Sequence, residues 1–266
     1  MEQYEQNLIL LEKIQKFNAT LKDRNIFSFS SDMDWACEDA IAATMDMFKE
    51  RGIKPYVFST HESAQISSRA AAGEIDVGIH PNFLQPSSQG SNFDEVLDFC
   101  FSICPNARGY RGHRYFEVND TMEKMRARGV KFTSNVCSLL NPSVPFLNRS
   151  AMVSFPIFME DGSYIAEGYP FNLAQMKKYF CAPGLKVINI HPMHFMLNTP
   201  YFKYTRDIKD RLSRSEWNAL DGEKLAKLRF AGAGISSFLL ELCGLAKSGG
   251  AEIKNISQLY DEIISL

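Results

Sequence analysis

Residues 26–35 read IFSFSSDMDW, so an apolar run ends in two acids and a tryptophan. The β-favouring residues 26–30 predict a strand, and Asp32, Asp34 and Trp35 follow it. In α/β barrels and open parallel sheets, the reacting groups lie in loops at the C-terminal ends of strands. Two carboxylates there suit a pair in which one binds a metal ion and the other accepts a proton. A helix N-cap and a solvated turn would explain either aspartate alone, but not both acids beside a tryptophan.

The rest of the chain repeats this pattern, with short apolar runs between amphipathic segments. The segments that predict helices in this part lie at residues 37–51, 93–103 and 120–128. Strands that alternate with helices are typical of a parallel α/β sheet or barrel. The predicted strands are residues 26–30, 55–59, 75–79, 107–110, 131–134, 153–158 and 185–190.

Two segments depart from this pattern. Residues 81–92, PNFLQPSSQGSN, are rich in turn formers and predict a long functional loop. The sequence EDGS at residues 160–163 indicates a hairpin turn that would pair residues 153–158 with residues 164–168.

The character of the chain changes after residue 200. We predict helices at residues 213–229, 234–246 and 256–265, with no further clear strand. No linker composition separates this part, so we expect one domain over residues 1–266. Its core would be about residues 26–200, with the C-terminal helices of residues 201–266 packed on it.

The composition excludes several classes of protein. Lys and Arg number 29 against 31 Asp and Glu, and this net charge of −2 gives no electrostatic case for binding nucleic acid. Residues 203–214 alternate both signs of charge, which favours a solvated face over an anion site. No apolar run approaches the roughly 18–20 residues of a membrane span, and acids interrupt residues 1–20, which argues against a signal peptide. Six scattered cysteines without a CxxC pair predict reduced thiols in a cytoplasmic protein.

All five histidines follow predicted strands. His61 and His80 follow the second and third strands, His113 follows the fourth, and His191 and His194 follow the last. One such histidine would more often be structural, but five in equivalent positions favour a site. Neutral imidazoles with a carboxylate suit zinc or a similar divalent ion.

Four motifs in order resemble the polysaccharide deacetylase superfamily (NodB-like, carbohydrate esterase family four), and most of all its WbmS-like branch. They are DMDW at residues 32–35, GIHPN at residues 78–82, RGHR at residues 111–114 and IHP at residues 190–192. The likeness spans roughly residues 27–199. It implies a distorted (β/α)7 barrel and the metal-dependent removal of an N- or O-acetyl group from a sugar.

The resemblance also implies residue roles. Asp34 and His80 would bind one divalent metal ion, which we expect to be zinc. Asp32 would be the catalytic base, oriented by Arg111, and His191 would be the general acid. The acidic fourth motif of the family falls near Asp161. The remaining expected substrate contacts are Trp35, Asn82, Tyr110, Arg114 and His194.

The chain departs from the family at one ligand. The second metal histidine normally lies four residues beyond the first, where this chain has Leu84. We therefore expect the third ligand to be His61, with His113 as the alternative.

These observations predict a deacetylase of surface polysaccharide or lipopolysaccharide biosynthesis. Without an export signal, its substrate would be a nucleotide- or lipid-linked sugar precursor. Two alternatives stay open: another metal-dependent hydrolase of an amide or phosphate ester, and a glycan-binding relative without a working site. The sequence predicts no oligomeric state.

Overall fold

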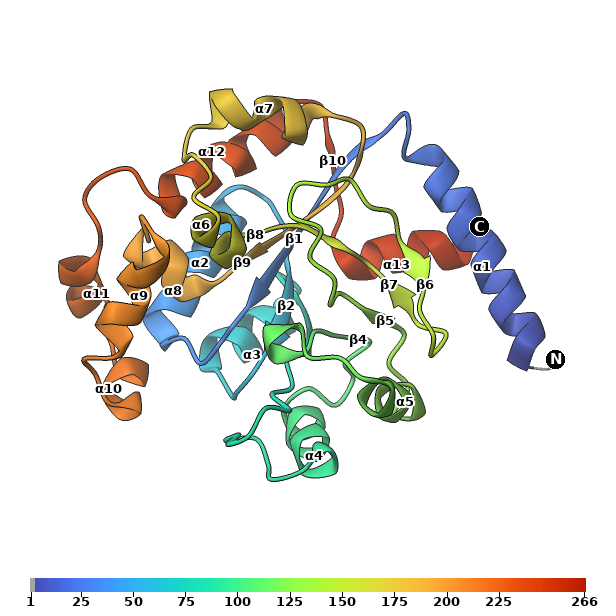
Figure 1. Cartoon of the computed structure of the whole chain (residues 1–266), viewed down its shortest axis with the longest axis horizontal. Helices are drawn as coiled ribbons and strands as arrows, with labels where there is room; N and C mark the ends of the chain where they lie inside the picture. The colour runs from blue at the N-terminus through green and yellow to red at the C-terminus, as the bar shows by residue number, and fades with distance from the viewer. Residues whose placement is uncertain (1–2) are drawn as a thin grey trace.

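Strand β1, Asn25–Asp32, lies inside a curled, mostly parallel sheet in the computed structural model, which describes residues 3–266 (Figure 1). Every residue of β1 from Ile26 to Asp32 is buried, as expected for a parallel strand covered on both faces. The sheet order is β6-β7-β5-β4-β3-β2-β1-β9-β8, and β10 also pairs with β1. The other strands are β2 Tyr56–Ser59, β3 Asp76–Ile79, β4 Gly109–Tyr110, β5 Phe132–Thr133, β6 Phe146–Leu147, β7 Val153–Ser154, β8 Ile157–Glu160, β9 Gly184–Ile190 and β10 Glu252–Ile253. The predicted α/β alternation is confirmed.

The predicted strand at residues 153–158 is divided between β7 and β8. Pro156 lies between the two and has no N–H to donate to a ladder. β7 pairs with β5, whereas β8 pairs with β9 at the other end of the sheet order. The single segment of residues 153–160 therefore contributes strands near both ends of the sheet order. The sheet curls as a distorted barrel does.

Helices surround the strands (Figure 1). α2 packs against α8, α11 and α12 pack on α8, and α13 packs on both α1 and β1. The α-helices are α1 Gln3–Thr20, α2 Glu38–Glu50, α3 Ala64–Ala71, α4 Phe93–Ile103, α5 Asn119–Ala127, α6 Asp161–Ala166, α7 Leu173–Cys181, α8 Pro192–Leu197, α9 Phe202–Lys209, α10 Arg214–Asn218, α11 Gly222–Leu228, α12 Ile235–Ser248 and α13 Ile256–Ser265. Within residues 3–266, none of these helices is long and apolar enough to cross a bilayer.

Three expectations about elements are wrong. EDGS at residues 160–163 begins α6 and makes no hairpin, because the Glu160 carboxylate accepts hydrogen bonds from the N–H groups of Gly162 and Ser163 at 2.9 and 2.6 Å. Residues 213–229 form two helices, since Asp221 caps a new helix by accepting from Lys224 N at 2.8 Å. A strand does follow residue 200, because β10 pairs in parallel with β1.

Candidate active site

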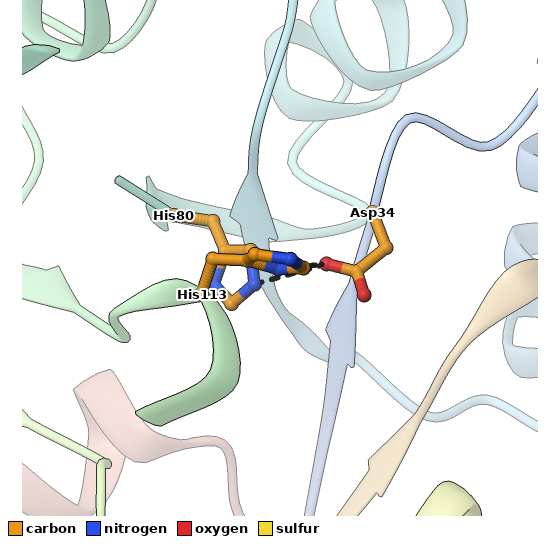
Figure 2. A group of neighbouring side chains, drawn as sticks. All are labelled: Asp34, His80 and His113. Carbon is orange, nitrogen blue, oxygen red and sulfur yellow. Dashed lines mark hydrogen bonds and ion pairs between the residues drawn. The ribbon is translucent and has the colours of Figure 1, made fainter. Parts of the chain in front are cut away.

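Asp34, His80 and His113 converge at the carboxyl ends of β1, β3 and β4 (Figure 2). Asp34 Oδ1 lies 3.1 Å from His80 Nε2 and 3.0 Å from His113 Nδ1. Asp34 and Trp35 adopt φ values of 43° and 55°, and this left-handed turn carries the chain away from β1. Partial desolvation raises the pKa of Asp34, but the hydrogen bonds from His113 and His80 outweigh it and hold the pKa well below its usual range.

His113 reaches this group because the chain after β4 continues beside the chain after β3. The His113 N–H donates to Pro81 O at 2.9 Å. Pro81 is the residue after His80, so this hydrogen bond places His113 beside His80. Gly112 permits this path, since a Cβ there would lie 2.3 Å from Phe116 O. The backbone then turns sharply, with Arg114 at a φ of 55° in the short 3-10 helix His113–Tyr115.

The structure does not bring His61 to this group. Its Nδ1 lies 2.8 Å from Thr60 Oγ1, and its side chain lines a separate cavity with Glu62 and Ser63. β2 ends at Ser59, and His61 lies in the turn before α3. The ligand set suggested by the geometry therefore contains His113 in place of His61.

Asp32 lies below this group and is held by a buried guanidinium. Arg111 is fully buried, and its Nη1 donates to Asp32 Oδ1 at 2.8 Å. Asn189 Nδ2 donates to the other carboxylate oxygen at 2.8 Å. Burial raises the pKa of Asp32, but the charges of Arg111, His80 and His191 together outweigh it and lower the pKa on balance. Asp32 therefore stays ionised although it is only 2% exposed.

Arg111 is itself fixed from several directions. It donates to Ser134 O and Ser134 Oγ, both at 2.7 Å, and to Asn189 Oδ1 at 2.5 Å. Its guanidinium also stacks over the Phe58 ring at 4.3 Å. Asn189 and Ser134 were missed from the sequence. Their signal was a polar side chain within an apolar strand, as in the run VINI at residues 187–190.

His191 faces the same site from the end of β9. Its Nδ1 lies 2.5 Å from Asp161 Oδ1, and its backbone N–H donates to Asp161 Oδ2 at 2.7 Å. Its Nε2 lies 3.8 Å from Asp32 Oδ2 and 3.7 Å from Asp34 Oδ2. Burial lowers the pKa of His191, but the charge and hydrogen bond of Asp161, together with the charges of Asp34 and Glu160, outweigh it and raise the pKa well above its usual value. The raised pKa favours the imidazolium form of His191, whose Nε2 lies on the side of the ring nearer the two aspartates.

Glu160, Asp161 and His191 form a second group with metal-binding residue types. Its carboxylates are already engaged, because Glu160 caps α6 and Asp161 also accepts from Gly162 N at 2.8 Å. The hydrogen bonds of Asp161 hold His191 in place. Asp34, His80 and His113 are therefore a better set of metal ligands than Glu160, Asp161 and His191.

The predicted substrate-contact residues divide into two sets. Trp35, Asn82, Arg114 and His194 line a cavity of about 770 Å³ beside the site. Arg114 and His194 also line the smaller cavity, about 460 Å³, that contains Asp32, Asp34, His80, His113 and His191. Tyr110 lines neither, because it is fully buried and its hydroxyl donates to Glu117 at 2.6 Å.

The family model described as WbmS-like polysaccharide deacetylase matches residues 29–208 of the chain. The chain therefore belongs to the WbmS-like polysaccharide deacetylase family. The matched segment of this family member contains Asp32, Asp34, both histidines of the cluster and His191. The resemblance deduced from the four sequence motifs is thereby confirmed.

Solved structures share the fold of this WbmS-like chain. A Bordetella bronchiseptica protein, described as a proposed polysaccharide deacetylase involved in O-antigen biosynthesis, is 22% identical with a TM-score of 0.72 and covers 85% of this chain and 92% of its own. A proposed polysaccharide deacetylase of Mycobacterium smegmatis is 14% identical with a TM-score of 0.51 and covers 90% of each chain. No curated protein matches the chain. The predicted deacetylase-type barrel is confirmed.

Proposed function

We propose that the chain is a metal-dependent deacetylase that removes an acetyl group from a sugar during surface polysaccharide or lipopolysaccharide biosynthesis. The observation that carries the proposal is the group Asp34, His80 and His113, whose ligand atoms lie within 4.8 Å of one another. Family membership supports the deacetylase class. The O-antigen role described for the Bordetella bronchiseptica protein supports the place in biosynthesis.

The donor set fits a divalent ion of the zinc type. Two imidazole nitrogens and one carboxylate oxygen are the ligands of many catalytic zinc sites, which keep a further position open. The two histidines converge on a single oxygen, Asp34 Oδ1, and a shared cation would satisfy all three groups. When bound, such an ion polarises a carbonyl and lowers the pKa of water.

Asp32 is proposed as the base. Arg111 and Asn189 each bind one of its carboxylate oxygens, which fixes the carboxylate plane while the residue still lines the cavity. A carboxylate held ionised at this position can accept a proton from an attacking water. Arg111 does not touch the cavity and acts through Asp32 as a positioning residue.

His191 is proposed as the acid. Asp161 holds its Nδ1 and keeps the ring protonated, so Nε2 can donate a proton to the departing sugar nitrogen or oxygen. Base and acid lie close together, with Asp32 Oδ2 and His191 Nε2 3.8 Å apart. Asp32 can therefore accept a proton from the attacking water and His191 can donate one to the leaving group within a single site.

The test is acetate release from acetylated sugars by the zinc-loaded protein. We expect Asp34→Ala, His80→Ala and His113→Ala each to lose activity by about a hundredfold or more, while His61→Ala keeps it. Equal activity in His113→Ala and the parent would overturn the site. Phosphate release without acetate release would instead indicate a phosphate-ester hydrolase. Sugar binding that chelator leaves unchanged, without any turnover, would indicate a glycan-binding protein.

A further inference from the structure

A larger cavity opens beside the proposed site and shares a wall with it. Arg114, His194, Phe202 and Lys209 line both this 770 Å³ cavity and the 460 Å³ cavity of the site. A substrate whose acetyl group lies at the metal ligands would therefore place its remaining part in the larger cavity.

The charges that line the larger cavity are mostly positive. Four cationic side chains line it, against one acid, Asp210, and the four are Arg114, Arg206, Lys209 and Arg214. Within residues 3–266, no ion pair joins any of these four to a carboxylate. Such a concentration of unpaired cations favours an anionic ligand.

Several of these cations are held in place. Arg214 lies over the Trp35 ring at 5.5 Å and donates to Ser88 Oγ at 2.9 Å. Lys209 lies over the Trp217 ring at 5.4 Å. The backbone of Arg114 has a φ of 55°, a left-handed conformation that is costly for a non-glycine residue and is often found at ligand sites.

Helix α9 separates the positive and negative charges that alternate along residues 203–214, a pattern from which the sequence predicted a solvated face. Residues 203–214 alternate in sign, but helical spacing places Arg206 and Lys209 on one face of α9, three residues apart. Both line the cavity, whereas Lys203 and Asp207 do not. The fold thus separates charges that are mixed along the chain.

We propose that the acetylated sugar is carried on a phosphate ester or diphosphate, which binds Arg206, Lys209, Arg214 and Arg114 in the larger cavity. This inference rests on the proposed deacetylase function. A diphosphate carries more negative charge than a single sugar carboxylate and suits four cations better. Nucleoside diphosphate sugars and lipid diphosphate sugars share this chemistry.

The experiment measures the binding of inorganic pyrophosphate, a nucleoside diphosphate and farnesyl diphosphate by calorimetry. The variants are Arg206→Gln/Lys209→Gln and the matched control Lys203→Gln/Arg211→Gln, which removes the same charge from the same segment outside this cavity. We expect the first variant to bind pyrophosphate at least about tenfold more weakly than the parent, and the control to bind it unchanged. All proteins keep the metal ligands, so phosphate attraction to bound metal cancels in the comparison.

The outcomes separate this inference from the proposed function. Tighter binding of the nucleoside diphosphate or of farnesyl diphosphate than of pyrophosphate would support the inference and identify the carrier. Equal pyrophosphate affinity in the two double variants would overturn it, even if acetate is released from neutral sugars. Pyrophosphate binding could be lost in Arg206→Gln/Lys209→Gln alone while the parent releases acetate from no sugar. This result would support the anion site and overturn the proposed deacetylase function.

Discussion

At the scale of single residues, the choice between His113 and His61 decides the ligand set. We predict that His113→Ala lowers zinc affinity by more than about a hundredfold, because even outer-shell changes around metal sites reach that size. His61→Ala removes the same side chain from a separate cavity and should leave the affinity unchanged. Competition with a metallochromic indicator measures both. Equal affinity in the two variants would show that zinc binds elsewhere.

Arg111 is the residue whose loss should most affect stability. Arg111→Met leaves the Asp32 carboxylate buried without its cation, and we predict a loss of about 3–5 kcal/mol in the free energy of unfolding. Adding Asp32→Asn should restore part of it, because the remaining buried group is then neutral. Urea unfolding of the parent, both single variants and the double variant measures this coupling. Additive effects in the cycle would contradict the prediction.

At the scale of elements, β3 and β4 approach each other closely at Gly78. A Cβ at this position would lie 2.5 Å from the backbone oxygen of Gly109 and 2.7 Å from the Tyr56 ring. We predict that Gly78→Ala destabilises the protein by about 1–3 kcal/mol. It should also weaken zinc binding, since His80 and His113 follow these two strands.

The control for this prediction is Gly244→Ala. Gly244 lies within α12 and has nothing within 4 Å of its added Cβ, so alanine should stabilise that helix by about 0.5–1 kcal/mol. Thermal unfolding and zinc titration of the two variants test both effects. A Gly78→Ala protein with parental zinc affinity would mean that the site tolerates separation of β3 from β4.

The elements also show what the sequence could predict. Strands appeared as short, mainly apolar runs, and the positions of the candidate site residues followed from the rule that parallel strands end at one edge. The start of α6 was missed because EDGS also suits a hairpin, and only the Glu160 cap decides between them. His113 was ranked second because its approach to His80 depends on a hydrogen bond to Pro81 O, which sequence spacing does not indicate.

At the scale of the whole molecule, the net charge did not indicate where the charged side chains gather. A net charge of −2 gave no reason to expect an anion site, and the signs alternate along residues 203–214. The fold brings four of the cations to one cavity beside the metal ligands. Net charge describes association and solubility, but the placement of each charge on an element determines which ligand a cavity attracts.

Metal binding should also stabilise the whole molecule, because the ligands come from loops after β1, β3 and β4 that meet only in the folded state. At a free zinc concentration of a hundred times Kd, mass action adds about 2.7 kcal/mol to the free energy of unfolding. For a chain of this size we predict a rise in Tm of roughly 5–10 °C, which chelator reverses. Asp34→Asn should abolish this rise, and His61→Ala should retain it. An equal rise in Asp34→Asn would place the stabilising zinc away from the cluster, for instance at the exposed thiol of Cys181.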